Sequence, residues 1–351
     1  MPTKPNKAGE QQPYVPAGNG DASGEYGNES GSNTHFQKFS KNQPNQINVA
    51  KMDKRFEQLK PRKTSDIMNN LKSIKITSKD GVEHSYGDDD VKQYLDEVRR
   101  KAEQFETFDE SQENGGMTPE RVAYDDKQVQ EEINSQAQKL GQPKYEKKAT
   151  FVLGLPASGK SFITDKLKQN EGAFEIDADL MKQRIPEFQK DVQMVSAVHE
   201  ESSWMSKKMQ NELVSKGANM IIGKVGGDSN YKSILKMAKK LKDNGYEINV
   251  VAMDLDPNKA LGRNLKRFQD RKLLNDPKKP ARIVNPLQTA ITQRTYLNTL
   301  ARLQNEGITK NYAIFDADVE RGSDPKLISK SEGYLEENKK FANFGKKRNS
   351  N

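Results

Sequence analysis

The sequence contains no cysteine among its 351 residues, which excludes disulfide bonds, thiolate metal sites and a cysteine nucleophile. It has only three histidines, His35, His84 and His199, and they lie too far apart to show the spacing of a metal site. A zinc centre or a Ser-His-Asp triad is therefore not expected. No apolar run approaches the ~18 residues that a membrane span needs, and there is no charged-then-apolar leader. We therefore expect a cytoplasmic chain without a membrane partner.

Hydrophobic residues are also scarce, at 32% of the chain. An average globular domain has about 45–50%, a figure that includes glycine. The deficit indicates that part of the chain is not packed. The charge is uneven, because residues 1–150 carry a net charge of −2 and residues 151–351 a net charge of +10. Lysines on solvated helix faces account for most of this excess, but a nucleotide or another polyanion would suit the field.

The composition divides the chain into four parts. Residues 1–45 have almost no aliphatic side chains and are predicted to be disordered, because they cannot offset the entropy of ordering. Residues 46–148 are predicted to be an accessory region, with a hairpin around 79–81, an amphipathic helix over 88–105 and a second helix over 119–140. The accessory region shows no catalytic constellation.

From Ala149 onward, apolar strands alternate with helical segments. Five strands are predicted, in "ATFVLGL", "GAFEIDAD", "ANMIIGKV", "YEINVVAMDLD" and "NYAIFDAD", and one long helix is predicted over 189–216. This alternation predicts an α/β domain over 149–330 with a parallel sheet flanked by helices. The basic tail, 331–351, interleaves aromatics with lysines, a pattern that suits single-stranded nucleic acid. Because no nucleic-acid-binding fold signature accompanies it, a frayed terminus is favoured.

The first predicted strand runs into the phosphate-binding pattern G-x-x-x-x-G-K-[ST]. The glycines allow backbone N–H groups to surround phosphate oxygens, and the following helix directs its positive end at the same anion. The phosphates of a nucleotide are thus expected to bind here, with Lys160 reaching the β- and γ-phosphates and the Ser161 hydroxyl binding Mg²⁺, although the loop alone does not distinguish kinases from GTPases, ATPases or nucleotide-dependent switches. The residues of the loop are Gly154, Leu155, Pro156, Ala157, Ser158, Gly159, Lys160 and Ser161.

Two carboxylates, Asp177 and Asp179, end the second predicted strand. A kinase needs a base at this place to accept the proton of the acceptor hydroxyl. From this stretch alone, a helix N-cap or a strand-end turn is an equally good interpretation. On the long helix, His199 and Trp204 could line an acceptor pocket, although helix packing is the favoured interpretation. Asp254 and Asp256 end a later strand and could touch a metal, although Asp256 before Pro257 also reads as a helix start.

The phosphate-binding loop, the strand end "EIDAD" and the following Lys182, Pro186 and Phe188 resemble the zeta toxins of bacterial toxin–antitoxin systems. The similarity continues to about Asp318, over about half of the chain. Zeta toxins are P-loop kinases that phosphorylate a hydroxyl of UDP-N-acetylglucosamine. The resemblance therefore implies an ATP-dependent kinase with a small-molecule acceptor and a protein antitoxin as a partner.

Carried over residue by residue, the resemblance implies that Lys160 is the P-loop lysine and Asp179 the catalytic base. It also implies that Arg267, in Lys-Arg-Phe, and Arg282, in Pro-Ala-Arg, are the two arginines that clamp the phosphate. These roles are chemically reasonable, because two arginines can neutralise the charge that develops on a phosphoryl group during transfer.

The chain departs from the family pattern at the end of its third predicted strand. An acidic residue is usual there, whereas this sequence has Gly223 and Lys224, with Asp228 a few residues later. Two alternatives therefore stay open. One is a nucleotide-binding component of a phage or mobile element with a degenerate kinase site, for which a phage structural protein would be a partner and the virion a location. The stretch "YVPAGNGDASGEY" is similar to linkers of phage head proteins. The other is a polynucleotide 5′-kinase, which the basic half favours.

Overall fold

The computed structural model describes residues 62–331, apart from 110, 225, 227–230, 275–279, 294, 310 and 321–322. The predicted disordered segment 1–45 lies outside the described residues, as does the tail from residue 332 onward. Within the described part of the chain, no helix is long and apolar enough to cross a membrane.

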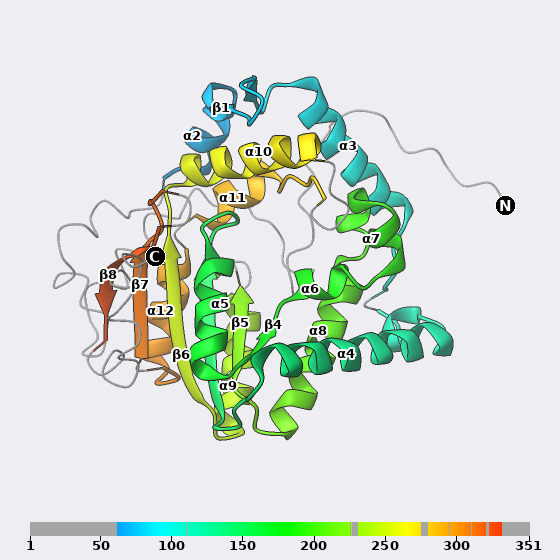
Figure 1. Ribbon diagram of the computed structural model, residues 1–351, viewed down its shortest axis with the longest axis vertical. Coiled ribbons are helices and arrows are strands. Elements are labelled where there is room, and N and C mark those ends of the chain that lie inside the picture. Colours follow the sequence, from blue (N-terminus) through cyan, green and yellow to red (C-terminus); the bar gives the residue numbers. More distant parts are fainter. Residues whose placement is uncertain are drawn as a thin grey trace, which may run out of the picture.

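A six-stranded sheet in the order β4-β5-β3-β6-β7-β8 forms the centre of the protein (Figure 1). The first five strands in this order run parallel, which confirms the predicted α/β fold. The sheet is mixed, however, because β8 pairs antiparallel with β7. The strand β8, which is short and lies at the edge of the sheet, was not predicted from the sequence. The strands are β3 (Lys148–Gly154), β4 (Phe174–Ile176), β5 (Met220–Lys224), β6 (Glu247–Asp254), β7 (Asn311–Asp316) and β8 (Lys326–Lys330).

Helices cover both faces of the sheet. Successive residues of a strand point to opposite sides, so a strand contributes side chains to a buried cluster on each face. On β3, Phe151 and Leu153 belong to one buried cluster, whereas Val152 belongs to another on the opposite face. The first cluster includes side chains of the helices α4 (Pro119–Leu140), α8 (His199–Ser215), α9 (Tyr231–Asp243) and α12 (Tyr296–Asn305). The second includes side chains of α5 (Lys160–Glu171) and of α10 (Pro257–Leu274). The predicted helix over 119–140 is confirmed at both ends.

The long helix predicted over 189–216 is wrong in its first third. The structure has α6 (Ala178–Lys182), α7 (Pro186–Lys190), a 3₁₀ turn (Val192–Val195) and only then α8. The interruption lies at Asp191, whose backbone is extended and whose side chain accepts a hydrogen bond from the Gln193 N–H at 2.9 Å. An aspartate that bonds its own downstream backbone competes with the helix, and the apolar spacing of the valines did not reveal it.

Residues 62–104 form a separate layer on α10, which we call the N-terminal unit. It contains α2 (Thr64–Asn69), a 3₁₀ turn (Leu71–Ser73), β1 (Lys75–Thr77), β2 (Glu83–Ser85) and α3 (Asp89–Gln104). The predicted hairpin is confirmed, since β1 and β2 pair antiparallel. A third buried cluster joins Tyr86, Val91 and Tyr94 of this unit to Leu265 and Phe268 of α10. Figure 1 shows the unit on the outer side of α10. The remaining described elements are a 3₁₀ turn (Glu113–Gly116) and α11 (Pro286–Thr292).

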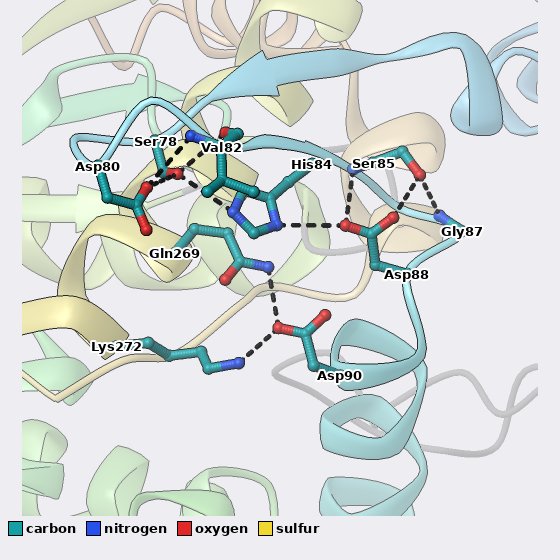
Figure 2. A network of polar contacts seen from close by, with 10 residues as sticks. All are labelled: Ser78, Asp80, Val82, His84, Ser85, Gly87, Asp88, Asp90, Gln269 and Lys272. Atoms are coloured by element: carbon teal, nitrogen blue, oxygen red, sulfur yellow. Dashed lines mark hydrogen bonds and ion pairs between the residues drawn. The ribbon is translucent and has the colours of Figure 1, made fainter.

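Polar contacts add to this docking (Figure 2). The Gln269 side-chain amide donates a hydrogen bond to Asp90 at 3.0 Å, and the Lys272 ammonium forms an ion pair with the same carboxylate. Inside the unit, the His84 ring lies between Asp88, at 3.3 Å, and the Ser78 hydroxyl, at 3.1 Å. The N-terminal unit is therefore held on α10 by both apolar and polar contacts.

Candidate active site

The phosphate-binding loop lies between the end of β3 and the start of α5. Three of its residues have positive φ angles: 150° at Gly154, 63° at Ala157 and 83° at Gly159. A Cβ atom at Gly154 would lie 2.7 Å from the Met253 carbonyl oxygen, so the strand end requires glycine at this position. The Ser158 hydroxyl is buried and has no hydrogen-bond partner among the described residues. The loop thus has the backbone form and a spare polar group that suit an anionic ligand.

Lys160 is folded back onto its own loop. Its ammonium donates hydrogen bonds to the carbonyl oxygens of Gly154, at 2.7 Å, and of Leu155, at 2.8 Å. Burial lowers the pKa of Lys160 to about 8, although the nearby charges of Asp177 and Asp179 act in the opposite direction. Both present partners are neutral, so a phosphate oxygen would be a stronger partner for this cation.

The two strand-end carboxylates differ in environment. Asp177 caps α6, since its Oδ1 accepts a hydrogen bond from the Asp179 N–H at 2.8 Å. Burial and the neighbouring charge of Asp179 raise the pKa of Asp177 to about 6. For Asp179, burial is outweighed by Lys182, at 3.3 Å, and by Arg282, at 2.9 Å, so its pKa is lowered. Asp177 therefore serves as the N-cap, whereas Asp179 is ionised and held by two cations.

Two arginines, Arg267 and Arg282, lie near the Asp179 carboxylate and come from different parts of the chain. Arg267 projects from α10, and its guanidinium donates a hydrogen bond to the Asn264 side chain at 3.0 Å. Its Nε atom is buried without a partner among the described residues. Burial and the nearby charge of Arg282 lower the pKa of Arg267 to about 10. Two adjacent guanidinium groups with unused donor capacity are a suitable environment for a phosphate.

One cavity of about 1550 Å³ connects these groups. The structure brings together Lys160, Asp179, Arg267 and Arg282 on its wall, although they are separated in the sequence by up to 122 positions. The cavity is larger than the roughly 300–1,000 Å³ of a typical small-molecule site, so it has room for a nucleotide and a second molecule.

Part of the wall was not anticipated from the sequence. Leu95, Val98 and Arg99 of α3 line the cavity, so the N-terminal unit forms part of its wall. The amphipathic pattern of α3 predicted a helix with one packed face, but it contained no signal for where that helix would dock. Lys182 also proves to be a direct partner of Asp179, whereas the sequence marked it only as part of a family pattern.

The other residues that the sequence singled out are divided between the cavity wall and the packed interior or helix ends. His199 lines the cavity, and burial followed by the charge of Lys182 lowers its pKa to about 3, so it is neutral. Trp204 instead packs near Phe108, with ring centroids 6.0 Å apart, as the helix-packing interpretation expected. Asp254 accepts a hydrogen bond from the Tyr296 hydroxyl at 2.8 Å, and Asp256 caps α10 through the Asn258 N–H at 2.9 Å. Neither of these aspartates lines the cavity.

The strand end at which this sequence departs from the family pattern also lies at the cavity. Gly223 and Lys224 end β5, and both line the cavity wall. Burial lowers the pKa of Lys224, and the charge of Asp177 opposes this effect. Asp228, which the sequence offered as a substitute for the missing acid, lies outside the described residues.

The oxygen donors at the loop fit magnesium. Among the described residues, no cluster of three or more His, Asp and Glu side chains could hold a metal by itself. Magnesium is typically held by only one or two protein oxygens together with the substrate's phosphates and water. The Ser161 hydroxyl lies in the first turn of α5 and lines the cavity, which suits such shared binding.

A loop of this form between a parallel strand and a helix, with a carboxylate and two arginines across the same cavity, defines a protein of the P-loop kinase class. The zeta toxin family model matches residues 131–327, more than half of the chain, and the chain belongs to this family. The N-terminal unit lies outside the matched range. No curated protein sequence matches the chain.

Several solved structures are similar. A chain of the PezAT chromosomal toxin–antitoxin system of Streptococcus pneumoniae is 18% identical, with a TM-score of 0.47 over 61% of this chain and 82% of that one. The AvrRxo1-ORF1:AvrRxo1-ORF2 complex with ATP matches with 17% identity and a TM-score of 0.45, over 64% and 73%. Deoxyadenosine kinase from M. mycoides with bound dATP matches with 12% identity and a TM-score of 0.30, over 49% and 93%.

Proposed function

We propose that the protein transfers the γ-phosphate of ATP to a hydroxyl group of a small molecule, with a sugar nucleotide such as UDP-N-acetylglucosamine as the expected acceptor class. The observation that carries the proposal is the contact between Arg282 and Asp179, at 2.9 Å. It supports the proposal because the proposed base and the proposed phosphate-binding arginine lie side by side on the cavity that the phosphate-binding loop also lines. Phosphoryl transfer uses a base for the acceptor proton and cations for the developing charge within one site.

In this proposal, ATP replaces contacts that the charged groups of the site make with one another and with the loop backbone. Arg282 and Lys182 neutralise Asp179, and Lys160 is bound to neutral carbonyl groups. A bound triphosphate would attract Lys160 and Arg282, because a phosphate oxygen is a better partner than a carbonyl and competes with a carboxylate. If Arg282 moved from Asp179 to a phosphate, the pKa of the Asp179 carboxylate would rise. Asp179 would then be a stronger base for the acceptor proton.

The other residues would act on the phosphate. Arg267 and Arg282 would neutralise the charge that develops on the transferred phosphoryl group, and Ser161 would hold Mg²⁺ together with the nucleotide phosphates. Bound magnesium would supply further neutralisation of that charge. We also propose that residues 149–330 are the kinase domain, that 46–148 are an accessory region of it, and that a protein antitoxin is a partner of the chain.

The test is a transfer assay with purified full-length protein and γ-labelled ATP. The acceptors are a panel of sugar nucleotides, with a 5′-hydroxyl oligonucleotide in a parallel reaction. A labelled small molecule that depends on Mg²⁺ supports the proposal. A labelled oligonucleotide would identify a polynucleotide kinase instead. Nucleotide binding without transfer to any acceptor would favour a protein that only binds nucleotide.

A further inference from the structure

The helix α3 connects two walls of the cavity that belong to different parts of the kinase fold. Figure 1 shows it running from the end of α10 toward α7. Its first half is docked on α10, where the Tyr94 ring packs against Phe268 with ring centroids 5.0 Å apart. Further along α3, Leu95 and Val98 line the cavity. One half of α3 is therefore fixed to the helix that carries Arg267.

The last turn of α3 is held on the other wall through Lys101. Its ammonium forms an ion pair with Asp191 and donates a hydrogen bond to the Gln193 side chain at 3.0 Å. Asp191 also caps the 3₁₀ turn (Val192–Val195) that leads into α8. The side chains of Lys101 and Asp191 are 12% and 37% exposed, so water screens their contact less than it screens a fully exposed ion pair.

The segment that Lys101 holds belongs to the wall with the proposed base, because α6, which carries Asp179, packs against α8. Arg282, which follows α10 in the chain, also connects the two walls through its contact with Asp179. In the proposed function, ATP takes Arg282 from Asp179, so this connection is lost when the nucleotide binds. Lys101 does not line the cavity, so its contact with Asp191 would remain.

We propose that Lys101 is a positioning residue of the kinase: through Asp191 it keeps the wall that carries Asp179 at a fixed distance from the wall that carries Arg267. The inference rests on the proposed function for the roles of the base and the arginine. Phosphoryl transfer requires the base and the cations to be placed around one phosphoryl group, and a misplacement of about 1 Å can cost about 100-fold in rate. Lys101 itself would touch neither substrate.

The test measures steady-state transfer from γ-labelled ATP to UDP-N-acetylglucosamine by the full-length protein and its variants. Lys101→Met removes the ammonium, and Lys101→Arg keeps a cation that can still reach Asp191. Asp191→Asn removes the partner's charge but keeps an oxygen that can cap the 3₁₀ turn. Arg100→Met is the matched control, because Arg100 is the adjacent cation on α3, pairs with Glu97 of its own helix and does not line the cavity. Thermal unfolding shows whether each variant folds.

We expect Lys101→Met to lower kcat by about tenfold or more while KM for ATP stays within about threefold, because the reacting groups are misplaced and nucleotide binding is kept. Lys101→Arg and Arg100→Met should keep the wild-type kcat. Asp191→Asn should lower kcat, and its combination with Lys101→Met should lower kcat no further, since both remove the same contact. Wild-type kcat in a folded Lys101→Met variant, or losses that add in the double variant, would overturn the inference.

A distance measurement tests the same connection without catalysis. Because the chain has no cysteine, spin labels attach only at introduced cysteines, here Leu273→Cys on α10 and Lys207→Cys on α8. Both positions are exposed and do not line the cavity. With Mg²⁺ and a non-hydrolysable ATP analogue bound, the distribution of label distances should shift or broaden in Lys101→Met and stay unchanged in Arg100→Met.

The two measurements separate the inference from the proposed function. If the label distances were unchanged in Lys101→Met, the inference would be wrong even where kcat fell. If the wild type transferred no phosphate while Lys101→Met changed the label distances, the proposed function would have failed and the structural connection through Lys101 would stand.

Discussion

The two strand-end carboxylates provide a direct test, because Asp177→Asn and Asp179→Asn are the same substitution two residues apart. We expect Asp179→Asn to lower phosphate transfer by roughly 10²–10⁴-fold, the usual contribution of a general base. That loss corresponds to about 3–5 kcal/mol of transition-state stabilisation. The affinity for ATP should be kept or should increase, since Lys160 and the loop backbone are untouched and Arg282 no longer pairs with a carboxylate.

Asp177→Asn should affect stability more than turnover. The asparagine oxygen can still accept the hydrogen bond from the Asp179 N–H, so the cap of α6 remains. The folded protein raises the pKa of Asp177 from 3.8 to about 6. The ionised form is therefore disfavoured by folding, and its cost appears as the pH rises from about 4 to 6. A shift of about two units corresponds to roughly 3 kcal/mol as an upper figure, because one unit is about 1.4 kcal/mol.

Three measurements test these expectations for the two variants. Turnover is measured with labelled ATP, ATP affinity by calorimetry, and thermal unfolding at several pH values between about 4 and 8. Asp177→Asn should be more stable than the wild type near pH 7, and the two should converge near pH 4. If Asp179→Asn retained wild-type turnover while Asp177→Asn lost it by a hundredfold or more, the base would be Asp177 and the reasoning from the Arg282 contact would be wrong.

The remaining predictions concern the loop and the N-terminal unit. Lys160→Ala should abolish measurable transfer, and in the wild type the ATP affinity measured by calorimetry should fall as the pH rises through about 8, where the free Lys160 loses its proton. Gly154→Ala should weaken ATP binding, measured in the same way, because the added methyl group would lie 2.7 Å from a carbonyl oxygen. Tyr86→Phe should lower the free energy of unfolding by about 1 kcal/mol, since it removes a buried hydrogen bond of 2.9 Å to the Leu261 carbonyl. Tyr94→Phe, in the same cluster, should be neutral or stabilising, because the Tyr94 hydroxyl is buried without a partner among the described residues. Denaturant unfolding measures both variants, and an equal loss of unfolding free energy in the two would contradict this reasoning.

Elements with strong local signals were predicted well. The helix α4 begins after Thr118, whose side chain accepts a hydrogen bond from the Arg121 N–H, and it ends at Gly141, which has a φ of 69°. Both signals are visible in the sequence, as is the glycine-rich loop before Lys160. The predicted strands of the parallel part of the sheet are equally clear, because strands buried on both faces are continuous apolar runs.

Elements that depend on tertiary contacts were predicted poorly. The break at Asp191 is coupled to Lys101 of α3, which forms an ion pair with that side chain. The strand β8 contains only five residues and owes its place to pairing with β7. For β8 the decisive partner is distant in the sequence, whereas at Asp191 a local cap and a distant ion pair act together. Apolar periodicity reports nothing about either kind of partner.

The sequence by itself determined the α/β class, the phosphate-binding loop and, through family resemblance, the residues expected to act on the phosphate. Turn conformation and the apolar runs typical of buried strands depend on residues adjacent in the sequence, so these features can be read locally. Only the tertiary structure decided that Arg282 contacts Asp179, that α3 forms part of the cavity wall, and that Lys101 joins this helix to Asp191. The physical reason is that charge balance and cavity shape depend on distances between segments far apart along the chain.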